Sequence, residues 1–316
     1  MSYDTVHLYL RKCDCRSGTY FFDAQYCLDN VQTIIEPDNS TTIRGDLIGE
    51  NGSKYNVKIR EEYIALTNCS LSKWYMGNNI SELDIHDTRE AIERLSEMLC
   101  LPMEKAIVSR FDFAINTITE YPTAAYLSHL GLLSRYVRLL EPYSLYYKQA
   151  NVQFVIYDKI KEQKAKRGYI PDLFVNSNLT RIEQRYLRRT KERFGHKVLA
   201  SMLYDKKFYN MLLKRLFDTY NAIQKINDTN LNFELVKTKT NLYNFCIMAY
   251  ANSIGGANAL FDQIEEAKAK KEIDALQAHY LRKAVKKAYK ADNNLIVSNP
   301  LITELDGKVR RAIKFY

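Results

Sequence analysis

Apolar and polar residues alternate with a period of two along much of the first 190 residues of the chain. Residues 4–10 place Val6, Leu8 and Leu10 on one face, a pattern typical of a strand with one buried side. The turn residues Glu50-Asn51-Gly52 stand before another alternating run and predict a hairpin. Further strands are predicted at residues 64–71, 107–115, 145–147, 152–157 and 179–186, the third and fourth of them as a second hairpin.

Beyond about residue 190 the period changes to 3.6, which is typical of amphipathic helices. One apolar stripe runs from Val198 to Tyr220. Helices are predicted at residues 241–253, at 257–290 after Gly255-Gly256, and from Pro300 to Tyr316. Two earlier helices are expected, one capped by Asp87-Thr88 and one from Tyr121-Pro122 to about Arg138.

Strands in the first part and helices in the second predict an α+β fold. We expect an antiparallel-sheet N-terminal catalytic domain at residues 1–190. A mostly helical region at residues 191–316 follows and would bind DNA or a partner.

The composition favours a globular protein of the cytoplasm. The chain has 316 residues, of which 46% are hydrophobic and 26% are charged. It contains no run of the roughly 18–20 apolar residues that a membrane span needs, and its first residues do not form a signal peptide. The six Cys include no CxxC pair and the five His are isolated, which argues against a zinc site or an HExxH metalloprotease.

The net charge of +9 is concentrated in one fifth of the chain. Residues 159–215 contain 16 Lys or Arg and 5 Asp or Glu, a net charge of +11, so the remainder carries −2. Such clustering with interleaved Tyr is typical of a protein that binds the phosphate backbone of a nucleic acid. The alternative is an ordinary solvated helix face.

Three predicted strands carry polar side chains on one face. These are Arg110 and Asp112 in the first, Tyr157 and Lys159 in the second, and Arg181, Glu183 and Arg185 in the third, with Glu162 one turn beyond Lys159. If the strands are neighbours, a tyrosine, carboxylates and cations come together, as phosphoryl transfer requires. The alternative is that the carboxylates are structural ion-pair partners of the arginines and that Tyr157 is one of 24 ordinary tyrosines.

The same segments resemble the gene II/X family of phage and plasmid replication initiation proteins, in particular members from Bacteroides-type bacteria. The resemblance covers roughly residues 4–220. Its matching stretches are Asp4-Thr5-Val6, Ser72-Lys73-Trp74 to Gly77-Asn78-Asn79, Ala106 to Ala114, Tyr157-Asp158-Lys159-Ile160-Lys161-Glu162 and Leu179 to Arg185.

The resemblance implies a rolling-circle initiator that nicks and rejoins one strand at a double-strand origin through a covalent phosphotyrosine. Tyr157 becomes the nucleophile, with Tyr146, Tyr147 and Tyr186 as fallbacks, and Lys159 becomes the second catalytic residue, as a contact of the reacting phosphate. Asp112 and Glu183, with Glu162 as a further candidate, become ligands of Mg²⁺ or Mn²⁺, because the paired-histidine metal motif of other initiators is absent. The DNA contacts implied here or predicted from the basic segment are Arg110, Lys159, Lys164, Lys166, Arg167, Arg181, Arg185, Arg188 and Arg189.

The expected partners are origin DNA, a host helicase, a host polymerase and a second copy in a homodimer. Two other functions are weighed: a non-catalytic origin- or operator-binding protein, whose binding would need no metal, and a tyrosine relaxase for mobilisation. Trp74 is either a base-stacking residue or a core anchor, whereas His86 and His196 are interpreted as structural or surface residues.

Overall fold

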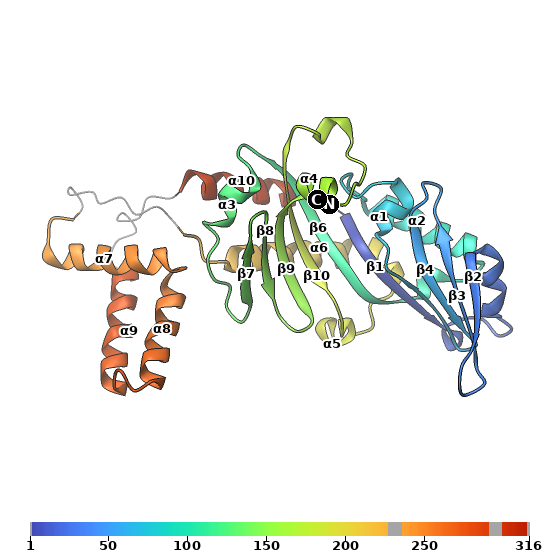
Figure 1. Cartoon of the computed structure of the whole chain (residues 1–316), viewed down its shortest axis with the longest axis horizontal. Coiled ribbons are helices and arrows are strands. Elements are labelled where there is room, and N and C mark those ends of the chain that lie inside the picture. Colours follow the sequence, from blue (N-terminus) through green and yellow to red (C-terminus); the bar gives the residue numbers. More distant parts are fainter. Residues whose placement is uncertain (1, 227–235, 291–298, 315–316) are drawn as a thin grey trace.

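A single antiparallel sheet of ten strands forms the centre of the computed structural model, which describes residues 2–226, 236–290 and 299–314. Across the sheet the order is β2-β3-β4-β5-β1-β6-β10-β9-β8-β7 (Figure 1). The strands are β1 (Ser2–Arg11), β2 (Asp29–Ile35), β3 (Thr41–Ile48), β4 (Lys54–Arg60), β5 (Tyr63–Thr67), β6 (Ile107–Thr119), β7 (Val137–Glu141), β8 (Ser144–Lys148), β9 (Val152–Asp158) and β10 (Asn178–Tyr186).

Helices surround the sheet and complete the predicted α+β fold. They are α1 (Leu71–Met76), α2 (Ile85–Leu99), α3 (Thr123–Leu127), α4 (Lys159–Ala165), α5 (Thr190–Phe194), α6 (Lys206–Ala222), α7 (Lys239–Ser253), α8 (Ala257–Ala269), α9 (Ala275–Lys290) and α10 (Pro300–Lys314). Short 3₁₀ turns are η1 (Lys12–Asp14), η2 (Phe21–Cys27), η3 (Met103–Lys105), η4 (Asp172–Phe174) and η5 (Ala200–Tyr204). Among the described residues, no helix is long and apolar enough to span a membrane.

One face of the sheet carries the main hydrophobic core, as the period-2 alternation predicted. Val6, Leu8 and Leu10 of β1 are all buried, and Phe111 and Phe113 of β6 continue this apolar face. The apolar stripe of α6 packs against it, behind the sheet in Figure 1. Because alternate side chains point to opposite sides, the polar residues of the same strands lie on the other face, called here the open face.

A small second cluster closes one end of the open face. Ile160 of α4 packs with Ile80 and Leu179, and Ile170 and Phe174 border them. Asp158 begins α4, since its side chain accepts a hydrogen bond from the backbone N–H of Lys161 at 2.9 Å. This cluster, called here the lid, therefore lies directly beyond the end of β9.

Two predicted helices are wrong in extent. The helix expected from Tyr121-Pro122 to about Arg138 consists only of α3, and residues 137–141 instead pair with β8 as edge strand β7. The single helix expected over residues 257–290 is two helices, α8 and α9. Lys271 adopts a left-handed conformation between them, and Asp274 and Gln277 form a new cap.

Two helix ends differ in detail from the predictions. Asp84, rather than Asp87, caps α2, while Asp87 completes the capping box from the third helical position. Pro300 is the first residue of α10, where its missing N–H is not needed. The last two residues of the predicted final helix lie outside the described residues.

The helical region beyond residue 190 has two parts. Helices α6 and α10 belong to the main core, to which α10 contributes Ile302, Leu305 and Val309. Helices α7, α8 and α9 have small cores of their own and project beside β7 in Figure 1. The domain boundary at residue 190 stays a prediction, although the core crosses it.

Candidate active site

The predicted site residues lie on adjacent strands of the open face. Strand β10 runs between β6 and β9, with Arg185 opposite Asp112 on one side and Arg181 opposite Tyr157 on the other. Glu183 lies between the two arginines on the same face of β10. The sequence predicts that the tyrosine, carboxylates and cations come together if the three strands are neighbours, and the sheet meets that condition.

Tyr157 and Glu183 are joined by a hydrogen bond. The tyrosine Oη donates to Oε2 of Glu183 at 2.8 Å, and the tyrosine is only 7% exposed. Burial and the neighbouring charge of Glu183 raise the pKa of Tyr157 well above 10. The hydroxyl is thus protonated at neutral pH, and its proton already points at a carboxylate.

Two guanidinium groups flank the carboxylate of Glu183. Nε of Arg185 lies 2.8 Å from Oε1, and Nε of Arg181 lies 3.5 Å from Oε2. Since Glu183 is 2% exposed, these cations supply the compensation that a buried charge needs. Arg185 keeps 24% of its side chain exposed, so it can also face a substrate phosphate.

Asp112 is the second carboxylate of the site. It lies 3.0 Å from Nη2 of Arg110, while burial and the nearby charge of Glu183 raise its pKa to about 6. Mutual repulsion of two carboxylates is the situation that a bound cation relieves, and Mg²⁺ commonly uses one or two carboxylates together with phosphate and water. Asp112 and Glu183 fit such a site. In the part of the chain that the structure describes, this site included, no three or more Asp, Glu, His or Cys gather to hold a metal, so phosphate and water would have to complete the coordination.

Glu162 takes part in a separate ion-pair cluster. Its carboxylate lies 2.9 Å from Nζ of Lys159 and also contacts Lys166. Burial alone would raise the pKa of Glu162, but the two lysines lower it to about 2. The structure therefore does not bring Glu162 together with Asp112 and Glu183, and its role as a metal ligand stays a prediction.

Lys159 is fully buried, 5.8 Å from the ring centroid of Tyr157. Burial and the charge of Arg181 lower its pKa to about 8. The amine lies beside the tyrosine, under the lid, and it can release a proton near physiological pH.

Asp4 is a site residue that the sequence analysis did not single out. Its carboxylate lies 3.1 Å from Nη2 of Arg181 and accepts a hydrogen bond from Asn79 at 2.9 Å. Arg181 is 0% exposed, so in this structure it faces Asp4 and Glu183 rather than solvent. Asp4 and Asn79 both lie in stretches that carry the family resemblance, which was the available signal.

The remaining predicted DNA contacts lie around the site. Arg110 borders it on β6 with 31% of its side chain exposed. Exposed cations follow at both ends of the site strands: Lys164 in the last turn of α4, Lys166 and Arg167 just after it, and Arg188 and Arg189 beyond β10. Their contacts with DNA stay predictions.

Three alternative residues are placed away from the site. Tyr147 and Tyr186 point into the main core, which leaves Tyr146 as the only one of the three fallback tyrosines on the face of Tyr157. Trp74 is 2% exposed and contacts the ring of Tyr55, so it is a core anchor.

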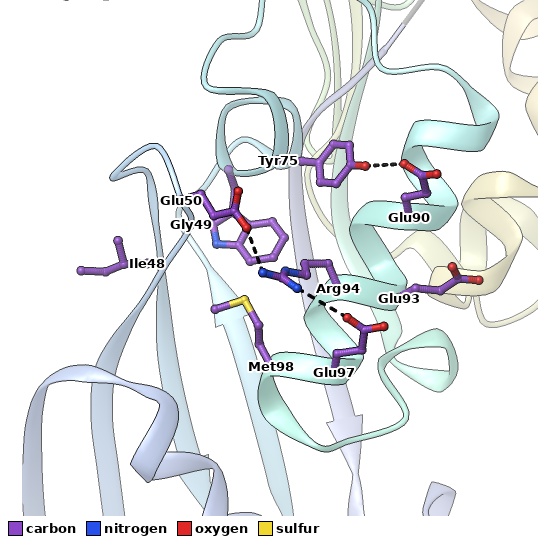
Figure 2. A pocket seen from close by; sticks show the side chains of 10 residues that line it. Ile48, Gly49, Glu50, Tyr75, Glu90, Glu93, Arg94, Glu97 and Met98 are labelled. Carbon is purple, nitrogen blue, oxygen red and sulfur yellow. Dashed lines mark hydrogen bonds and ion pairs between the residues drawn. The ribbon is translucent and has the colours of Figure 1, made fainter.

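A hollow of about 680 Å³ lies between the β3–β4 turn and α2 (Figure 2). Its charged lining is mainly acidic, with Glu90 bonded to Tyr75 and Arg94 held between Glu50 and Glu97. Since an acidic hollow repels a phosphate backbone, this cavity is a poor site for DNA.

A known protein family matches more than half of the chain. The family is described by the N-terminal region of a phage replication-associated protein, and its model covers residues 29–207, which include Asp112, Tyr157 and Glu183. The match confirms the resemblance that the sequence motifs indicated. No curated protein matches the chain.

Proposed function

Because the chain belongs to this family of replication-associated proteins, we propose that it is a replication initiator that nicks and rejoins one DNA strand at a double-strand origin. Tyr157 is the nucleophile, and rolling-circle replication of a phage or plasmid follows. The observation that carries the proposal is the hydrogen bond from Tyr157 to Glu183, on an open sheet face flanked by arginines.

The reaction is a transfer of a phosphodiester to tyrosine. The Oη–P bond forms while the P–O3′ bond breaks, and the phenolic proton moves to Glu183, which already accepts its hydrogen bond. The departing 3′ oxygen takes a proton from water and becomes a free 3′-OH. Attack of a 3′-OH on the phosphotyrosine reverses these steps and rejoins the strand.

The arginines serve the phosphate. Arg185 and Arg110 are the partly exposed cations beside the two carboxylates, and both can donate to phosphate oxygens as charge builds up on them. Arg181, which is fully buried, instead orients Glu183 through an ion pair, and Arg181 is in turn positioned by its ion pair with Asp4. These roles explain why three arginines surround two acids.

Asp112 and Glu183 would hold Mg²⁺ or Mn²⁺. The ion would supply positive charge to the scissile phosphate. Glu162 joins them only if it leaves Lys159 and Lys166. The free 3′-OH suits a host polymerase, a host helicase would displace the strand, and a homodimer would suit an inverted-repeat origin.

The test is incubation of the protein with supercoiled plasmid that carries its origin, with Mg²⁺ or Mn²⁺. We expect open-circular DNA and a covalent protein–DNA adduct that Tyr157→Phe abolishes. Tyr146→Phe is the matched control, since Tyr146 lies on the same face, and it should still form the adduct. An adduct that survives Tyr157→Phe would overturn the assignment of the nucleophile. Metal-independent binding without an adduct from the parent would support the non-catalytic alternative.

A further inference from the structure

The sheet has the strand order of an internal duplication. Strands β5-β4-β3-β2 extend from β1 in the same succession as β10-β9-β8-β7 extend from β6, and β1 pairs antiparallel with β6 at the centre. In each half a central strand is followed by a four-stranded meander whose last strand returns to the central one. Helices that pack on the core face follow each meander. The two halves are thus related by an approximate two-fold axis between β1 and β6.

The catalytic residues lie in one half only. In the N-terminal half, β4 and β5 occupy the places of β9 and β10, and neither contains Asp or Glu. Lys58, Arg60 and Tyr63 lie on the open face where the other half carries Tyr157 and Glu183. The N-terminal half therefore has the same surface without the nicking chemistry.

Two cations on this surface face each other across neighbouring strands. Arg44 of β3 is directly opposite Lys58 of β4, a like-charge pair that destabilises a sheet. Neighbouring cations are neutralised: Arg60 lies 2.8 Å from Glu36, and Lys54 lies 2.7 Å from Asp46. Arg44 and Lys58, by contrast, make no ion pair within the described ranges. They line a hollow of about 440 Å³ together with the amide side chains of Asn30, Gln32, Asn56 and Asn68. The one acid in this lining, Asp46, is already bonded to Lys54, Asn30 and Asn56.

Aromatic side chains continue the same row toward the catalytic half. Lys58 is opposite Ala65, and Ala65 is opposite Tyr9 of β1. The rings of Tyr9 and Tyr63 have centroids 4.9 Å apart, and Nζ of Lys58 lies 6.0 Å from the Tyr63 centroid. Partly exposed aromatics beside cations on an open sheet are the combination that binds single strands, through base stacking and phosphate contacts.

We propose that the open face of the N-terminal half binds single-stranded DNA, as a continuation of the strand that Tyr157 cleaves. Arg44 and Lys58 contact its phosphates, and Tyr9 and Tyr63 contact its bases. Six strand spacings separate β3 from β9, about 29 Å, or about eight nucleotides at stacked spacing. The inference rests on the proposed function, because it assigns the second half of the sheet to the same DNA strand.

The test measures binding of fluorescent (dT)20 and of a 20-bp duplex in the Tyr157→Phe background, which cannot cleave. The variant is Arg44→Ala/Lys58→Ala. Loss of two phosphate contacts should weaken (dT)20 binding about 25-fold at 0.1 M salt and reduce the salt slope by about 1.4. Tyr63→Ala should weaken it about tenfold through lost stacking.

The matched control is Arg89→Ala/Lys105→Ala. It removes the same two residue types from α2 and η3, which pack on the helix side, and it should leave (dT)20 binding unchanged. Because Arg44→Ala/Lys58→Ala removes a like-charge pair, it should not lower the melting temperature. Weaker binding by this variant would then not be a result of unfolding.

Binding of (dT)20 by the Arg44/Lys58 variant within about twofold of its parent would overturn the proposal. A loss confined to the duplex would do the same. Adduct formation with origin plasmid is scored separately in the Tyr157 background. If the protein with Tyr157 intact forms no adduct, the proposed function fails. If it forms the adduct but the Arg44/Lys58 variant binds (dT)20 as tightly as its Tyr157→Phe parent, only the second surface fails.

Discussion

Asp112→Asn should raise the free energy of unfolding at neutral pH, although it removes one of the two carboxylates of the candidate active site. Burial and Glu183 raise the pKa of Asp112 to about 6, compared with 3.8 for an unperturbed aspartate. A difference of about 2 in pKa corresponds to about 3 kcal/mol. Because the folded state holds the proton more tightly, the parent loses stability as pH rises from about 4 to about 6, and the full cost applies above that.

The assay is urea denaturation of parent and variant at pH 5.0 and pH 7.5. About half of the cost is present at pH 5.0 and nearly all of it at pH 7.5, so the stability advantage of Asp112→Asn should grow by roughly half of that cost between them. Asp172→Asn, which changes an exposed carboxyl, should show no such growth. If the difference in unfolding free energy between Asp112→Asn and the parent is the same at both pH values, the charge of Asp112 does not destabilise the folded parent.

The same variant also tests whether a metal ion binds between Asp112 and Glu183. Mg²⁺ or Mn²⁺ bound between Asp112 and Glu183 would stabilise the parent by about 1.4 kcal/mol at ten times its dissociation constant. Asp112→Asn should lose most of this gain. An equal gain in both proteins would place the ion elsewhere.

Three further predictions concern the base, the last helix and the core. Glu183→Gln should slow single-turnover nicking about 10²- to 10⁴-fold, because the proton acceptor is lost; an unchanged rate would exclude Glu183 as the base. Leu305→Ala should cost about 2–5 kcal/mol of unfolding free energy, because α10 packs into the main core; a cost near zero would show that α10 is separable. Gly49→Ala should cost about 2 kcal/mol, because its Cβ would lie 2.4 Å from the carbonyl oxygen of Trp74. Gly307→Ala, with open space around it, should be neutral or stabilising in the same urea assay.

The sequence by itself determined the strands of the site and the direction of their side chains. Period 2 is a local property of a strand, so the face shared by Arg181, Glu183 and Arg185 could be identified before any partner strand was known. The turn at Glu50-Asn51-Gly52 likewise defined its hairpin, as the register of β3 and β4 confirms.

Local pattern failed where tertiary contacts decide between helix and strand. Residues 137–141 are mostly exposed at the sheet edge, so no buried face marks them as a strand, and pairing with β8 decides their conformation. The break between α8 and α9 follows from a cap at Asp274, in a charged segment that contains no glycine or proline to mark the end of a helix.

Only the tertiary structure decided which strands are neighbours. β1 and β6 are about a hundred residues apart in the chain, and no periodicity within either strand encodes their pairing. That pairing creates the two-fold arrangement of the sheet and brings Asp4 to Arg181. The same long-range packing buries Arg181, whereas Glu162 pairs with Lys159 locally, three residues away on α4. Sequence thus supplied the chemical groups and their faces, whereas contacts between distant segments determined which groups meet, because those contacts depend on the packing of the whole sheet.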